Sequence, residues 1–114
     1  MNRMATSLAE RTCQPCDGGV QPLDAAQAQS YLKQLPGWKL EHDALHISKK
    51  FRFANFARAL TLVNQIGEIA EEQHHHPDLR LGWGYVTVYF TTHAIKGISE
   101  NDFILAAKIE RLTQ

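Results

Sequence analysis

The spacing of the apolar residues changes abruptly near residue 54, and this change constrains the fold more than any other feature of the chain. Between Leu45 and Phe53 apolar and polar residues alternate, which is typical of a half-buried β-strand. From Asn55 to about His75 apolar residues recur every three or four positions, which predicts a long amphipathic helix. Strict alternation returns in Tyr85–Thr92, the clearest strand of the sequence. A long helix therefore connects two strands of one domain.

Shorter segments supply the remaining elements. Asp24–Leu35 carries apolar residues at helical spacing, with Asp24 suited to cap the helix. Trp38–Glu41 predicts a β-hairpin with the 45–53 strand, and Leu79–Leu81 predicts a short strand before the last one. Ser99–Asp102 has the spacing of a capping box and starts a final apolar helix. The order α-β-β-α-β-β-α predicts an α+β domain, with helices packed on one face of a four-stranded, mostly antiparallel sheet.

Size and charge narrow the class of protein. A chain of 114 residues has room for one core. Twelve basic residues balance twelve acidic ones, so no net field attracts nucleic acid or an anionic membrane. No apolar run approaches the roughly 20 residues of a membrane span, and Met1–Cys13 lacks the apolar core of a secretory signal. We therefore expect a cytoplasmic protein with neither nucleic acid nor membrane as a partner.

Residues 1–22 read as a flexible leader that precedes the folded domain, residues 23–114. Several glycines and prolines surround the pair Cys13 and Cys16. Such a C-x-x-C pair is either half of a zinc site or a redox pair, but no second pair accompanies it and no strand precedes it. The sequence therefore predicts no functional role for these two cysteines.

Histidines are the chemically most informative residues of the chain. Three consecutive ones, His74–His76, end the long helix before Pro77, and His93 ends the last strand. Imidazole is the side chain that titrates near neutral pH, so a histidine cluster is suited to proton transfer. We expect His75 to lie beside Glu71, which would orient its ring, while the next histidine and His93 close a shared pocket. One imidazole would protonate a leaving group and another would remove a proton.

Metal binding and purely structural roles stay open for the same residues. Glu71 and His75 share a helical face, and His93 would complete a metal site. Successive helical residues diverge by about 100°, so the three consecutive histidines cannot share one ion within a helix. Purely structural roles would also account for three of the residues. His74 would end the helix, Asp102 would complete the capping box and Trp38 would pack in the core.

The spacing of these residues resembles the signature of a known family. Glu71-x3-His75-His76-Pro77 is followed by Trp83, His93 and Asp102 at the intervals of the pterin-4a-carbinolamine dehydratases. The resemblance to this family extends to Gly37-Trp38, Phe51-x-Phe53, Thr92-His93, Gly97 and Ser99-x-x-Asp102. The likeness spans about residues 22–112 and leaves the leader outside. His74 stands where relatives often have Asp or Asn.

This resemblance implies a hydro-lyase that converts 4a-hydroxytetrahydrobiopterin to quinonoid dihydropterin. Such an enzyme recycles tetrahydrobiopterin for aromatic amino-acid hydroxylation, which implies a functional link to phenylalanine hydroxylase. It uses neither metal nor redox cofactor. Its catalytic residues would be His75, His76 and His93, with Asp102 expected to steady His93. Its substrate pocket would include Glu71, Trp38, Asp102, Pro77 and Thr92.

Self-association is the remaining expectation. An open four-stranded sheet leaves exposed edges, and the final helix has more apolar surface than one stripe requires, so we predict a homodimer or homotetramer. The alternative to catalysis is a regulatory binding module of the same fold, because some animal members of the family dimerise a homeodomain transcription factor.

Overall fold

The computed structural model describes residues 8–15 and 21–113 of the chain. Its helices and strands follow the predicted order, with a short 3-10 helix before the last helix. They are Ala25–Leu32 (α2), Lys39–Leu40 (β1), Ile47–Arg52 (β2), Phe56–Gln73 (α3), Asp78–Gly82 (β3), Tyr85–Phe90 (β4), His93–Ile95 (η1) and Glu100–Leu112 (α4). Residues 8–10 are also helical.

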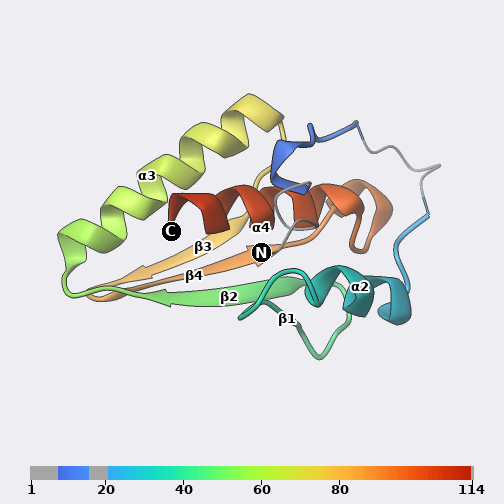
Figure 1. Ribbon diagram of the computed structural model, residues 1–114, viewed down its shortest axis with the longest axis horizontal. Coiled ribbons are helices and arrows are strands. Elements are labelled where there is room, and N and C mark those ends of the chain that lie inside the picture. The colour runs from blue at the N-terminus through green and yellow to red at the C-terminus, as the bar shows by residue number, and fades with distance from the viewer. Residues whose placement is uncertain (1–7, 16–20, 114) are drawn as a thin grey trace.

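The strands form one sheet in the order β1-β2-β4-β3, and every neighbouring pair is antiparallel. The central pair runs from Ile47 opposite Phe90 to Arg52 opposite Tyr85. Helices α3 and α4 lie on the same side of the sheet, and no helix of the described residues covers the opposite side (Figure 1). The predicted α+β architecture is therefore confirmed.

The alternation in β2 and β4 sorts their side chains between the two sides. Ile47, Phe51, Val86, Val88 and Phe90 are buried beneath the helices. Their neighbours along each strand point to the uncovered side.

Lys49 is the exception on the covered side. Its Nζ lies 2.5 Å from Oε1 of Glu110 and 3.2 Å from the carbonyl oxygen of Pro36. Lys49 lies on β2, which is an inner strand of the sheet. An ion pair with α4, rather than exposure at an edge, therefore accommodates this charge.

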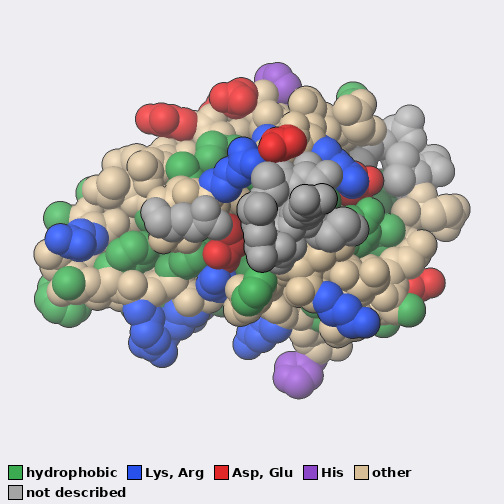
Figure 2. All heavy atoms as spheres, viewed as in Figure 1, with side chains coloured by type: hydrophobic (Ala, Val, Ile, Leu, Met, Phe, Trp, Pro, Cys, Tyr) green, Lys and Arg blue, Asp and Glu red, His purple; other side chains and the backbone are tan. Residues whose placement is uncertain are grey.

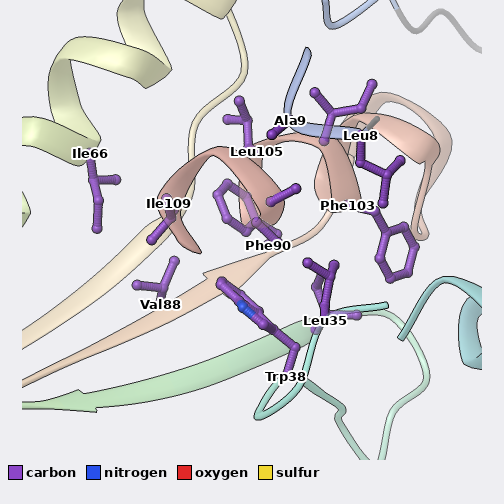
Figure 3. Close-up of a cluster of buried hydrophobic side chains, with 14 of the residues drawn as sticks. Leu8, Ala9, Leu35, Trp38, Ile66, Val88, Phe90, Phe103, Leu105 and Ile109 are labelled. Atoms are coloured by element: carbon purple, nitrogen blue, oxygen red, sulfur yellow. The ribbon is translucent and has the colours of Figure 1, made fainter. Parts of the chain in front are cut away.

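The core lies between the sheet and α4, where Val88, Phe90, Leu105 and Ile109 meet (Figure 3). Trp38 enters this core from below, with its ring centroid 6.0 Å from that of Phe90. The indole Nε1–H of Trp38 donates to Glu110 at 2.8 Å, so its polar group is satisfied inside the protein.

The leader departs from expectation where it is described. Leu8 and Ala9 are buried within the same core as the sheet and α4, because this short apolar turn covers α4, against which it lies in Figure 1. A separate flexible leader over residues 1–22 is therefore wrong for residues 8–15. Cys16, like the rest of residues 1–7 and 16–20, lies outside the described residues.

Charged side chains of both signs are spread over the surface that Figure 2 shows. On the uncovered side of the sheet, Lys50, Arg52 and Arg80 are exposed. Within the described residues, no helix has the length and apolar character needed to cross a bilayer.

Candidate active site

The site begins where α3 ends. His74 adopts a left-handed conformation with φ of 55°, and its backbone N–H bonds the carbonyl of Ala70. The N–H of His75 bonds the same carbonyl at 3.2 Å. This is a common way to end a helix, and histidine, like Asn and Asp, tolerates the left-handed region better than most residues. The helix therefore stops at Gln73, and His75 lies beyond it rather than in its last turn.

His75 and Asp102 form a buried pair at the centre of the site. Nε2 of His75 lies 2.6 Å from Oδ1 of Asp102, and the two side chains are 12% and 0% exposed. The imidazole also lies nearly parallel to the ring of Phe90, with centroids 6.1 Å apart. A carboxylate on one edge and an aromatic ring on one face hold the imidazole in a single orientation.

The second carboxylate oxygen of Asp102 is also fully engaged. Oδ2 accepts hydrogen bonds from the Thr92 hydroxyl at 2.8 Å and from the Ser99 backbone N–H at 2.9 Å. The hydroxyls of Thr92 and Ser99 lie 2.7 Å apart, and all three residues are buried. The predicted capping interaction is present but accounts for only one of the contacts of Asp102. The network joins the start of α4 to the segments that follow β4 and α3.

His76 makes a different kind of pair on the surface. Its Nε2 bonds Oε2 of Glu71, and the two side chains are 57% and 79% exposed. We expected Glu71 to orient His75 and Asp102 to steady His93, and both pairings are wrong. The left-handed turn at His74 swings His75 inward to Asp102 and leaves His76 facing the last turn of α3.

A hollow of about 600 Å³ opens beside these pairs. Four of the predicted site residues line it: His75, His76, Thr92 and His93. His93 is exposed at the start of η1 rather than at the end of the strand, since β4 ends at Phe90.

The remaining predicted residues lie outside the lining of this hollow. Asp102 is completely buried behind His75, and Glu71 lies behind His76. Trp38 is in the core, and Pro77 is half-buried after the lining histidines. Trp83 is 70% exposed in the turn between β3 and β4.

Sequence reasoning did not assign the other eight lining residues to the site, namely Cys13, Gln14, Pro15, Gln73, His74, Thr91, Ala94 and Asn101. The first three belong to the segment that was read as a flexible leader. Gln73 and Asn101 stand directly beside residues of the motif, in the last turn of α3 and the first turn of α4. Their position beside the motif was the available signal.

The hydrogen bonds fix what the imidazoles can do. An ionised carboxylate only accepts hydrogen bonds, so Asp102 holds the proton of a neutral His75 on Nε2 and leaves the lone pair on Nδ1. Glu71 imposes the same tautomer on His76. His93 has no side-chain hydrogen bond within the described part of the chain. The arrangement offers fixed proton acceptors beside an unconstrained third imidazole.

Metal ligation would require a different arrangement. Among the described residues, no three His, Cys, Asp or Glu side chains are grouped as ligands for one ion. The carboxylates that would complete such a site instead bond the imidazole nitrogens.

Comparison with known proteins decides the family. The model of the family described as "Pterin 4 alpha carbinolamine dehydratase" matches residues 21–112. The chain belongs to this family. Pterin-4-alpha-carbinolamine dehydratases are hydro-lyases, so the chain is classed as an enzyme of that type.

Relatives and a solved structure agree with this assignment. A protein of Halorhodospira halophila, provisionally named a pterin-4-alpha-carbinolamine dehydratase, is 52% identical over 106 residues, which cover 93% of this chain and 97% of that protein. One of Rubrobacter xylanophilus, with the same provisional name, is 49% identical over 94% of this chain and 99% of its own. A crystal structure titled transcriptional coactivator/pterin dehydratase, from Brucella melitensis, has a TM-score of 0.79 and 26% identity, covering 82% of this chain and all of that one.

The relatives also extend the likeness beyond the family model. An alignment over 106 of the 114 residues must begin before Cys13. The family model itself begins at residue 21, as expected for a leader outside the family likeness, so residues 13–15 are shared with this relative and not with the family model.

Proposed function

We propose that this protein dehydrates 4a-hydroxytetrahydrobiopterin to quinonoid dihydropterin by histidine acid–base catalysis. The observation that carries the proposal is the convergence of His75, His76 and His93 on one hollow, with two of the rings fixed by carboxylates. Its size is ordinary for a small-molecule site, which typically measures about 300–1,000 Å³.

The reaction needs one proton removed and one supplied. The N5–H bond of the substrate breaks and its proton moves to a base. The freed electron pair forms the N5=C4a bond, and the C4a–O bond breaks as the departing hydroxyl takes a proton from an acid. The products are quinonoid dihydropterin and water, with no electron gained or lost overall.

His75 is our candidate for the base. Its ring is the most rigidly held of the three, and its Nδ1 carries the lone pair when Asp102 accepts from Nε2. Asp102 also stabilises the imidazolium that forms once Nδ1 takes the proton. Asp102 acts as a positioning residue, because its carboxylate is buried behind His75, and the Thr92 hydroxyl holds that carboxylate in place.

His76 and His93 are the candidates for the acid. Both line the hollow and both are exposed, so either exchanges protons readily with water between turnovers. Pro77, Trp38 and Glu71 then act on the site from outside its lining. The physiological role that follows is tetrahydrobiopterin recycling in the cytoplasm, in support of phenylalanine hydroxylase.

The test measures dehydration directly. The 4a-hydroxytetrahydrobiopterin is generated by a phenylalanine hydroxylase, and formation of the quinonoid product is followed by absorbance. Wild-type protein should accelerate the step, and His75→Ala combined with His76→Ala should abolish the acceleration. An unchanged rate on adding wild-type protein would end the proposal. Dialysis against a chelator should leave the rate unchanged, and a loss restored by metal would favour the metal alternative.

A homodimer or homotetramer is proposed with this function. Strand β3 is a five-residue edge of the sheet, whereas the opposite edge, β1, has two residues. A partner sheet added along β3 would cover the longer edge. Sedimentation equilibrium at micromolar concentration should give at least twice the mass of one chain.

A regulatory binding role is the second candidate, favoured by the coactivator title of the Brucella melitensis structure. The exposed apolar residues Phe56 and Leu60 on α3 offer a surface for such a contact. A captured regulator whose binding survives the double histidine variant would support this role.

A further inference from the structure

The segment of residues 8–15, here called the N-terminal strap, is anchored to the domain by its first residues, 8–11. Leu8 is 2% exposed within the core, and Nζ of Lys108 donates to the carbonyl of Ala9 at 2.7 Å. Arg11 pairs with Glu100 at 2.6 Å. Apolar burial and contacts to α4 therefore hold the strap in one position.

The last residues of the strap, 13–15, lie between α3 and α4. The backbone N–H of Cys13 donates to Oε1 of Gln73 at 2.9 Å. Two hydrogen bonds join Gln14 to Asn101. The backbone N–H of Gln14 donates to Oδ1 of Asn101 at 2.9 Å, and Nδ2 of Asn101 donates to the backbone carbonyl of Gln14 at 2.6 Å. Figure 1 shows the strap in blue, between the end of α3 and α4.

This position places the strap against the substrate hollow. Cys13, Gln14 and Pro15 line the same hollow as the histidines. The backbone groups of Cys13 and Gln14 are bonded to side chains of α3 and α4, so the strap is already in place before a ligand binds. A wall fixed in advance loses little freedom when a ligand binds.

We propose that the N-terminal strap is a substrate-binding wall, in which residues 13–15 contact the bound pterin and determine how tightly it is held. This inference rests on the proposed function. The strap acts on binding, whereas the histidines and Asp102 act on proton transfer. Loosening the strap should therefore raise KM and leave kcat nearly unchanged.

The first experiment weakens the anchoring of the strap at a residue that lies outside the hollow. Leu8 anchors the strap but does not line the hollow, so Leu8→Ala should weaken the wall without altering any lining side chain. The expected result is a KM at least fivefold higher, with kcat within twofold of wild type. Leu45→Ala, which shortens an exposed leucine of the β1–β2 turn, is the matched control. An unchanged KM in Leu8→Ala would assign the strap a structural role only.

The second experiment needs no loosened variant. Cys16→Ser leaves Cys13 as the single thiol of the chain. Its alkylation by iodoacetamide is timed with and without 7,8-dihydrobiopterin, at a concentration shown to saturate by calorimetric titration. Bound pterin should slow the reaction at least fivefold, and equal rates would overturn the inference.

The two proposals fail in different ways. Wild-type protein that neither binds pterin nor speeds dehydration ends the proposed function, and this inference with it. An active wild type with an unprotected thiol and an unchanged KM in Leu8→Ala overturns the strap alone.

Discussion

Replacing Asp102 by Asn changes which ring nitrogen of His75 carries the proton, while the imidazole itself stays in the site. The amide oxygen must take the place of Oδ2, which accepts from Thr92 and Ser99, so the amide NH₂ faces His75. Since that group only donates, Nε2 of His75 becomes an acceptor and the ring proton moves to Nδ1. The base proposed for the reaction is then lost without removing the imidazole.

The sizes of the two effects follow from these contacts. A charge-assisted hydrogen bond worth about 1.5–3 kcal/mol gives way to a neutral one of about 0.5–1.5 kcal/mol, so the free energy of unfolding should fall by roughly 1–2 kcal/mol. A positioned acid or base contributes about 10²–10⁴ in rate, so kcat should fall at least about 100-fold while the protein stays folded.

Three measurements test the Asp102→Asn variant: urea unfolding, the dehydration rate and the tautomer of His75 by nitrogen-15 NMR. The chain supplies a matched control in Asp43→Asn, because Asp43 bonds Nδ1 of His46 at 2.8 Å in the exposed β1–β2 turn. The Leu45 N–H holds the pKa of Asp43 below its ordinary value, so the control also removes a charge at neutral pH. Unaltered kcat in Asp102→Asn, or His75 still protonated on Nε2, would refute the reasoning.

Three further changes test the other contacts. Glu71→Gln alters an exposed pair with His76, so the free energy of unfolding should change by less than about 0.5 kcal/mol in urea titration and kcat by less than tenfold. A loss as large as that of the buried aspartate variant would contradict this. Thr92→Val removes a buried donor and should cost about 1–3 kcal/mol by the same titration, with Thr92→Ser recovering most of it. Trp38→Phe loses the bond to Glu110 and should cost about 0.5–1.5 kcal/mol with KM unchanged, whereas a raised KM at full stability would place the indole against the substrate.

Much of the fold was predictable because each element has a local signal. The alternation in β2 and β4 fixes which side chains are buried, and the helical spacing before residue 74 fixes the buried stripe of α3. Lys49 was harder to place, because its partner Glu110 is far along the sequence and no local rule connects them.

The composition of the site was more predictable than its pairings. Motif spacing indicated His75, His76 and His93, but a single left-handed residue at His74 exchanged the carboxylate partners. Periodicity cannot reveal where such a residue reverses the direction of successive side chains. The glycines and prolines near Cys13 concealed the strap for a related reason, since they report local chain flexibility and not the burial of Leu8.

The network around Asp102 has a consequence for heating. The orientation of His75 depends on Asp102 in α4, which is held in turn by two buried residues, Thr92 after β4 and Ser99 just before α4. Little of this machinery can melt while the rest of the domain stays intact. Thermal inactivation and the cooperative calorimetric transition should therefore coincide, with no warm interval in which an inactive but folded enzyme accumulates.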